Sequence, residues 1–168
     1  MNISTKQVDY MLQQLRVLVV DDNAFTRKIV RGLLANIGVK AVIEAADGLA
    51  ALELIRTAPP DVVILDWEMP LLNGPEVVRI VRSPGVFPTP DIPIIMLTAH
   101  GERWRIVESV KLGVNEFLCK PVSAKLLLDR LVSILLKPRE SVKFGTYYGP
   151  APRAPVAKPS GGMEPAQI

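Results

Sequence analysis

Short apolar runs alternate with amphipathic stretches through most of this 168-residue chain, and this alternation restricts the fold more than any other feature. It is typical of a parallel β-sheet whose strands are joined by crossover helices. Because helices cover both faces of such a sheet, its strands are rich in Val, Ile and Leu. The five predicted strands are Val17–Val20, Ala41–Glu44, Asp61–Leu65, Ile92–Leu97 and Glu116–Leu118.

A helix is expected after each strand. In the first, Ile29, Leu33 and Ile37 recur at helical spacing, and Gly38 follows as a stop signal. The sequence therefore predicts an α/β domain over residues 15–137, with a doubly wound five-stranded parallel sheet. The expected helices are Ala24–Ile37, Leu49–Arg56, Pro75–Arg82, Glu102–Leu112 and Ala124–Leu136.

The two ends of the chain lie outside this pattern. Residues 1–14 are predicted to form an amino-terminal helical extension. Four apolar residues in this segment and at position 15 have the spacing of one helix face. Its stripe is Val8, Met11, Leu12 and Leu15. That stripe must pack on the domain or pair with another chain, so a homodimer is one expectation. Residues 138–168 are rich in Pro and Gly without periodicity, and we expect a disordered tail there.

Composition limits the class of protein. A single cysteine, Cys119, excludes an internal disulfide and fits a reducing compartment. The polar amino terminus is unlike a signal peptide, and no apolar run is long enough to span a bilayer, so we expect a cytoplasmic protein without a membrane partner. The net charge of +3 resides mostly in residues 138–168, and no helix-turn-helix pattern accompanies it. A nucleic-acid partner is therefore not expected.

The residues that end the predicted strands carry the chemistry. Ligands of an open parallel sheet bind beyond the carboxyl ends of its strands. Those ends carry Asp21, Asp22, Asp66, Thr98 and Lys120. Each has a structural explanation when taken alone: Asp22 or the neighbouring Asn23 could cap a helix, for example, and Lys120 could be a solvated charge. Together they place three carboxylates, a hydroxyl and an ammonium group at one edge.

Such a cluster calls for a cation. Three adjacent carboxylates repel one another and raise each other's pKa values unless a positive charge lies between them. Their hard oxygen ligands favour Mg²⁺, and the chain offers neither the cysteine pair nor the histidine cluster of a zinc site. Three carboxylates and one ammonium group leave two negative charges, which one divalent ion offsets.

Four segments together resemble the receiver domain of bacterial response regulators. They are Val19–Asn23, Asp66–Pro70 with Asn73–Gly74, Thr98–Ala99, and Lys120–Pro121. The resemblance covers residues 15–137 and is strongest to single-domain members such as the chemotaxis response regulator. It implies a flavodoxin-like sheet with strand order 2-1-3-4-5. It also implies a signalling protein, not an enzyme, which receives a phosphoryl group from a sensor histidine kinase or a histidine phosphotransfer protein and signals to a downstream protein target.

The resemblance also implies roles for single residues. Asp66 is the implied phosphorylation site, and Asp21, Asp22 and Asp66 would hold Mg²⁺ together with the backbone carbonyl of Glu68. Lys120 would bind the phosphoryl oxygens, and Thr98 would be the switch hydroxyl. Phe117 falls at the aromatic switch position, although a core aromatic at a strand end explains it equally well.

Other residues near these motifs have less specific interpretations. Trp104 is expected on a solvent-exposed flank of the Glu102–Leu112 helix, with Val107 and Val110 facing inward. It is either a lid over apolar atoms or a partner contact. Three further residues have structural interpretations: His100 in a surface loop, with an alternative role in water access to the phosphoryl group, Cys119 as a small buried hydrophobe, and Trp67 as a semi-exposed packing residue.

Three other functions compete with this one. Haloacid-dehalogenase-type phosphatases also use an aspartyl phosphate, but they need a second Asp where this chain has Glu68. A transcription factor would need a DNA-binding domain, and only 31 residues without helical periodicity follow Lys137. A phosphorylation-independent scaffold built on the same fold stays open as the alternative.

Overall fold

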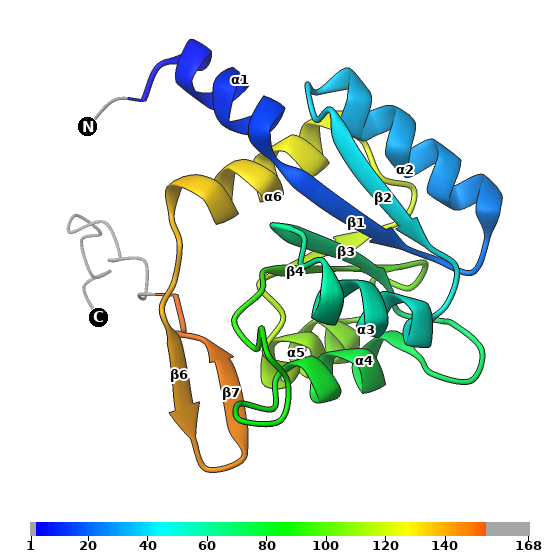
Figure 1. Cartoon of the computed structure of the whole chain (residues 1–168), viewed down its shortest axis with the longest axis vertical. Coiled ribbons are helices and arrows are strands. Elements are labelled where there is room, and N and C mark those ends of the chain that lie inside the picture. The colour runs from blue at the N-terminus through cyan, green and yellow to red at the C-terminus, as the bar shows by residue number, and fades with distance from the viewer. Residues whose placement is uncertain (1–2, 154–168) are drawn as a thin grey trace, which may run out of the picture.

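A computed structural model describes residues 3–153, and a five-stranded parallel sheet forms its centre (Figure 1). Its strand order is β2-β1-β3-β4-β5, which confirms the flavodoxin-like order. Hydrogen-bonded register pairs Val20 with Leu65 and Leu65 with Met96, so the strand ends are level at one edge. The strands are β1 (Arg16–Val20), β2 (Ala41–Ala45), β3 (Val62–Asp66), β4 (Ile94–Thr98) and β5 (Glu116–Cys119).

Helices cover both faces of the sheet. The bounds are α1 (Thr5–Gln14), α2 (Ala24–Asn36), α3 (Gly48–Thr57), α4 (Gly74–Val81), α5 (Arg103–Leu112) and α6 (Ala124–Leu136). One face packs against α1, α2 and α6 through a cluster that contains Val17 and Val19. The other packs against α3, α4 and α5 through a cluster that contains Leu18 and Val20. Successive strand residues thus enter opposite cores, which is why the strands are apolar throughout.

The fourth strand begins two residues later than predicted. Ile92 is buried and apolar, as in a strand, but Pro93 follows it. Proline has no N–H to donate to a ladder. Its carbonyl still accepts a hydrogen bond from the Val63 N–H at 2.9 Å, and regular pairing starts at Ile94.

The amino-terminal helix packs on its own domain. Ser4 caps α1, and its side chain and that of Gln7 form a reciprocal capping box. Leu12 and Leu15 are buried in the same core cluster as Leu131 of α6, and Val8 packs against that cluster. The apolar stripe that suggested a homodimer is therefore covered within the chain, so it no longer supports that expectation.

The expectation of disorder in residues 138–168 is wrong for its first part, where a β-hairpin forms, and residues 154–168 lie outside the described residues. Strands β6 (Ser141–Phe144) and β7 (Tyr147–Pro150) pair antiparallel. Gly145 begins the two-residue loop with φ +57°, the left-handed conformation such loops require. The sequence signal for this turn was a glycine between two aromatic residues. The surrounding prolines obscured that signal, because they are typical of a disordered segment.

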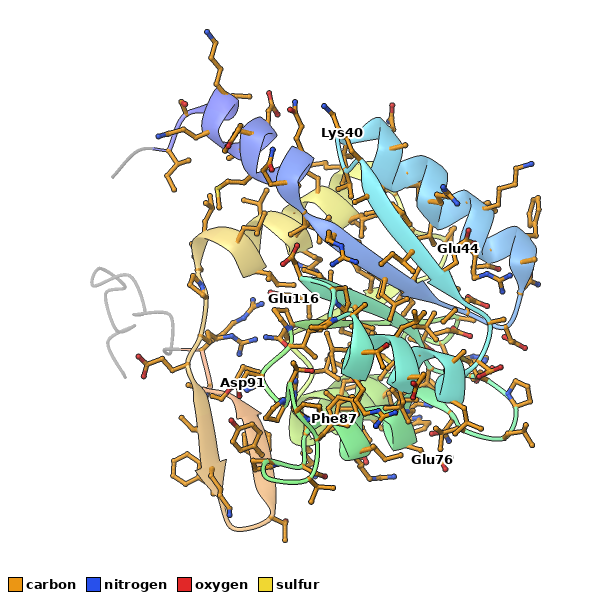
Figure 2. The ribbon with its side chains drawn as sticks, in the orientation of Figure 1. Lys40, Glu44, Glu76, Phe87, Asp91 and Glu116 are labelled. Atoms are coloured by element: carbon orange, nitrogen blue, oxygen red, sulfur yellow. The ribbon has the colours of Figure 1, made fainter. Side chains whose placement is uncertain are left out.

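Contacts with the domain hold the hairpin in place. Arg139 donates hydrogen bonds to the backbone carbonyls of Asn115 (2.7 Å) and Ala151 (3.0 Å). Tyr148 donates to Asp91, which lies beside the hairpin (Figure 2). Asn115 and Asp91 lie far from the tail in sequence, so local composition could not predict these contacts. Within residues 3–153, no helix combines the length and apolarity that a bilayer crossing requires.

Candidate functional site

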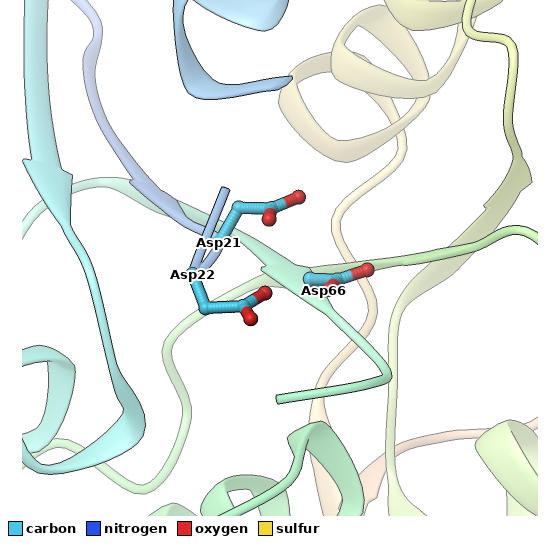
Figure 3. A group of neighbouring side chains, drawn as sticks. All are labelled: Asp21, Asp22 and Asp66. Atoms are coloured by element: carbon cyan, nitrogen blue, oxygen red, sulfur yellow. The ribbon is translucent and has the colours of Figure 1, made fainter. Parts of the chain in front are cut away.

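Three carboxylates meet at the edge where β1 and β3 end, as predicted (Figure 3). Asp66 is the last residue of β3, and Asp21 and Asp22 directly follow β1. One oxygen from each lies within 4.8 Å of the others. Asp21 and Asp66 are buried, whereas Asp22 is exposed. Three hard oxygen donors with an opening to solvent are a donor set that suits Mg²⁺.

Capping by a neighbour leaves the carboxylate of Asp22 free for this cluster. The side chain of Asn23, not that of Asp22, accepts hydrogen bonds from the N–H groups of Phe25 (2.9 Å) and Thr26 (3.2 Å) at the start of α2. One oxygen of Asp21 accepts from the Asn23 N–H at 2.9 Å, which fixes its orientation. The helix-cap explanation that sequence left open therefore belongs to Asn23 alone.

Lys120 supplies the positive charge at this edge. Its Nζ lies 2.8 Å from Asp66 Oδ1 and 3.0 Å from Asp21 Oδ2. Burial lowers the pKa of Lys120, but its hydrogen bonds to Asp66 and Asp21 outweigh burial and raise that pKa above its usual value. The ammonium group therefore stays charged at neutral pH.

Asp66 carries the unfavourable electrostatics of the cluster. Burial raises its pKa, the hydrogen bond from Lys120 lowers it, and the negative charges of Asp21 and Asp22 raise it further. The net effect is a pKa above the ordinary value. A divalent cation would relieve this repulsion, which is the physical basis for a metal at this position.

Gly74 lets the start of α4 approach the end of β3. A Cβ atom at this position would lie 2.5 Å from the Asp66 carbonyl oxygen and 3.0 Å from the Trp67 Cα. Its N–H donates to the Trp67 carbonyl at 2.9 Å. Asn73 caps the helix, with Glu76 completing a capping box. The Asn-Gly pair of the motif therefore fixes the loop that follows Asp66.

Thr98 ends β4 next to the carboxylates and is fully buried. Its Oγ1 accepts hydrogen bonds from the His100 N–H (3.2 Å) and from Nη1 of Arg105 (3.0 Å). The side chain of Glu68 faces the same guanidinium and lies 3.5 Å from the His100 imidazole. Sequence reasoning missed Arg105, because one arginine in the first turn of a helix carries no signal of its own.

Phe117 is half-buried on β5, where it borders a groove of about 880 Å³ between α5, β5, α6 and the hairpin. Apolar residues border much of the groove, and the exposed ones are Ile106, Val110, Leu126 and Phe144. The structure places the predicted aromatic switch residue at the base of a surface that another protein could contact.

The predicted orientation of α5 is wrong. Val107 and Val110 are 42% and 63% exposed, and the inward face instead carries Arg105, Ser109 and Leu112. Ser109 is small, and its buried hydroxyl donates to the Arg105 carbonyl at 2.8 Å, so the helix can approach the domain closely through this face. The spacing of the hydrophobic residues alone had predicted that the opposite face of α5 points inward.

Four other expectations near the site have mixed outcomes. Trp104 is exposed, as predicted, but its ring also meets that of Trp67 edge to face, with 6.1 Å between centroids. Trp67 is buried at 8% exposure, which corrects its prediction as semi-exposed. Cys119 ends β5 exposed, so its prediction as a buried hydrophobe is wrong. His100 lies exposed in the loop after β4, in agreement with its surface interpretation.

Comparison with known proteins identifies the family. The family model of the response regulator receiver domain matches residues 17–132. The chemotaxis protein CheY1 of Helicobacter pylori is 38% identical over 122 residues, which cover 72% of this chain and 97% of that protein. The chemotaxis protein CheY-3 of Vibrio cholerae is 34% identical, with coverage of 73% and 92%.

Solved structures agree with the sequence comparison. The structure of Vibrio cholerae CheY4 has a TM-score of 0.62 at 35% identity. The match covers 70% of this chain and 95% of the CheY4 chain. The receiver domain of the histidine kinase CKI1 from Arabidopsis thaliana, complexed with Mg²⁺ and BeF₃⁻, has a TM-score of 0.64 at 30% identity, with coverage of 77% and 95%. The parallel sheet, the acidic cluster and these relatives together show that the chain belongs to the response regulator receiver domain family.

Proposed function

We propose that the chain accepts a phosphoryl group on Asp66 from a sensor histidine kinase or a histidine phosphotransfer protein, and then signals by contact with a downstream protein. The observation that carries this proposal is the position of Asp66. Its carboxylate lies at the level end of the central strand β3, next to two other carboxylates and the ammonium group of Lys120. This is the arrangement that a phosphoryl acceptor needs.

Each residue at the edge has a proposed task in the transfer. An oxygen of Asp66 attacks phosphorus while the bond from phosphorus to the donor histidine nitrogen breaks, and the nitrogen keeps the electron pair. Lys120 neutralises an oxygen of the phosphoryl group. The carboxylates of Asp21, Asp22 and Asp66, with the carbonyl of Glu68, would hold Mg²⁺. Bound there, Mg²⁺ supplies charge neutralisation of the transferring group.

The switch is proposed to begin at Thr98. Once Asp66 carries a phosphoryl group, its new oxygens can accept a hydrogen bond from the Thr98 hydroxyl, which draws that loop toward the site. Movement of Thr98 leaves space toward which Phe117 can turn. Phe117 has no hydroxyl, so only packing transmits this step.

The proposed output surface is the groove over α5, β5 and α6. Phe117 borders it, so a rotamer change there alters the groove directly. Trp104 stands at 55% exposure on the same helix as Ile106 and Val110, and an exposed Trp is a common anchor of protein interfaces. We therefore assign Trp104 to partner contact as well as to packing on Trp67.

Phosphorylation itself tests this function. With Mg²⁺ present, acetyl phosphate or a phosphorylated histidine protein should add one phosphoryl group, measured by intact mass. Asp66→Ala should abolish the addition, and Asp129→Ala, at an exposed carboxylate of α6, should leave it intact. Label that persists in the Asp66 variant refutes the assignment. Absence of label from the wild-type protein with every donor favours the phosphorylation-independent scaffold.

A further inference from the structure

Arg105 links the proposed switch to the exposed face of α5. Its side chain is only 13% exposed. Nη1 donates to the Thr98 hydroxyl oxygen at 3.0 Å, and Nη2 donates to Glu68 Oε1 at 2.8 Å. One guanidinium thus bridges the residue that ends β4 and the loop that follows β3.

Two tryptophans lie beside the same guanidinium. Its Cζ lies 5.1 Å from the ring centroid of Trp67 and 5.2 Å from that of Trp104. Both distances are within the range of cation–π attraction, about 6 Å. A lysine could not reproduce this, since the planar fork of arginine donates in two directions while it stacks on rings. Any movement of Arg105 must therefore alter the surroundings of the exposed Trp104.

The Thr98 hydroxyl oxygen has no acceptor capacity left. A hydroxyl has two lone pairs, and those of Thr98 are engaged by the His100 N–H and by Arg105. The contact also has a cost, because the buried Nε of Arg105 lacks a hydrogen-bond partner in the part of the chain that the structure describes. The arrangement holds Thr98 firmly, but only while Arg105 stays beside the two rings.

We propose that Arg105 is a positioning residue that holds Thr98 in the unphosphorylated arrangement and transmits the movement of Thr98 to Trp104. This inference rests on the proposed function of Asp66 and Thr98. When the hydroxyl turns toward a phosphoryl group, it leaves Arg105, which then loses one of its two hydrogen-bond partners. The guanidinium shifts against the two rings, and Trp104 changes its surroundings on the exposed surface of α5.

The proposal predicts the direction in which affinity for a phosphoryl mimic changes. Beryllofluoride with Mg²⁺ is the probe. Without Arg105, Thr98 is no longer held away, so less of the binding free energy is spent on moving it. Arg105→Met should bind the probe more tightly than the wild-type protein, by about fivefold or more. Arg103→Met is the matched control, because it removes an exposed arginine from the same turn of α5.

A double-mutant cycle tests whether the effect passes through Thr98. In a Thr98→Ala background the hydroxyl is absent, so Arg105→Met should no longer tighten binding. Arg105→Lys is the second variant, and it keeps the charge without the fork. It should also tighten binding, and it decides the matter if the Met variant does not fold.

Fluorescence of Trp104 supplies an independent readout. The chain has two tryptophans, so Trp67→Phe leaves Trp104 as the single tryptophan. Its emission should change when beryllofluoride binds, and this change should be lost in Arg105→Met although the probe still binds. Unchanged or weaker binding by both Arg105 variants, or an emission change that survives without Arg105, overturns the inference. Failure of the wild-type protein to bind the probe at all instead refutes the proposed function.

Discussion

Replacement of Asp66 by asparagine should stabilise the metal-free protein, although it removes the central functional group. The substitution keeps the shape of the side chain and removes one of three negative charges whose oxygens lie within 4.8 Å. It also removes the charge of the ion pair with Lys120, at 2.8 Å. These two effects oppose each other, so their magnitudes decide the sign.

Coulomb energies give the balance. At an effective dielectric constant of about 20, two unit charges at the 4.8 Å limit repel by about 3.5 kcal/mol, so the two repulsions on Asp66 amount to at least about 7 kcal/mol. The attraction to Lys120 at 2.8 Å is about 6 kcal/mol by the same formula. The difference is about 1 kcal/mol in favour of the neutral asparagine side chain, and relief of burial of the charge adds to it.

Thermal unfolding in EDTA-containing buffer measures this difference. A gain of about 1 kcal/mol raises Tm by roughly 2–4 °C in a chain of this size. Asp129→Asn, at an exposed carboxylate of α6, is the control and should leave Tm nearly unchanged. Added Mg²⁺ should raise the Tm of the wild-type protein and have less effect on the Asp66 variant, because a ligand stabilises only the fold that binds it.

The pH dependence checks the cause. Burial is the main reason that the pKa of Asp66 is raised above its ordinary value of 3.8 in the folded protein. The folded state therefore binds this proton more tightly than the unfolded state, and the metal-free wild-type protein loses stability as pH rises through the raised pKa. The advantage of the asparagine variant should be largest at neutral pH and should shrink toward pH 3.8. A lower Tm at neutral pH, or an advantage that grows in acid, refutes this reasoning.

Three further predictions concern packing, partner contact and the hairpin. Gly74→Ala should destabilise the fold by about 1–3 kcal/mol in urea titrations, because the new Cβ meets the backbone carbonyl that ends β3. Gly32→Ala, where a Cβ meets nothing within 4 Å, is the control and should not destabilise. Trp104→Ala should weaken binding of the cognate kinase or target about tenfold, or about 1.4 kcal/mol, by calorimetry, while small donors still phosphorylate the protein. Tyr10→Ala, at an exposed aromatic of α1, should bind normally, and equal losses in both variants contradict the assignment. Arg139→Met should speed amide exchange in β6 and β7 but not in the central sheet, since its two hydrogen bonds join the hairpin to the domain. Unchanged exchange shows that other contacts suffice.

The order of elements followed from the sequence because it depends on local pattern. Strands buried on both faces read as continuous apolar runs, and helices read as stripes, so both could be recognised without tertiary information. The acidic site followed for a related reason. The carboxyl ends of parallel strands share one edge, so Asp21, Asp66 and Lys120 had to converge once the strands were placed.

Features that depend on distant contacts were not predicted. Val107 and Val110 satisfy the spacing of an inward face, yet α5 turns Ser109 inward because a small residue permits close packing there. The hairpin is similar: its partners, Asn115 and Asp91, lie far away in the sequence. A residue's own neighbourhood in sequence contains no record of such partners.

The sequence by itself therefore determined the sheet, the edge of the sheet that carries the site, and the chemistry of the carboxylates there. Periodicity and strand ends are local properties of the sequence. Tertiary structure alone decided which face of α5 is exposed and where the tail lies. It also decided that Arg105 contacts Thr98 and lies beside two tryptophans. The physical reason is that side-chain contacts between elements depend on helix rotation and packing distance. These are fixed by the complete set of interactions in the fold, and no single segment specifies them.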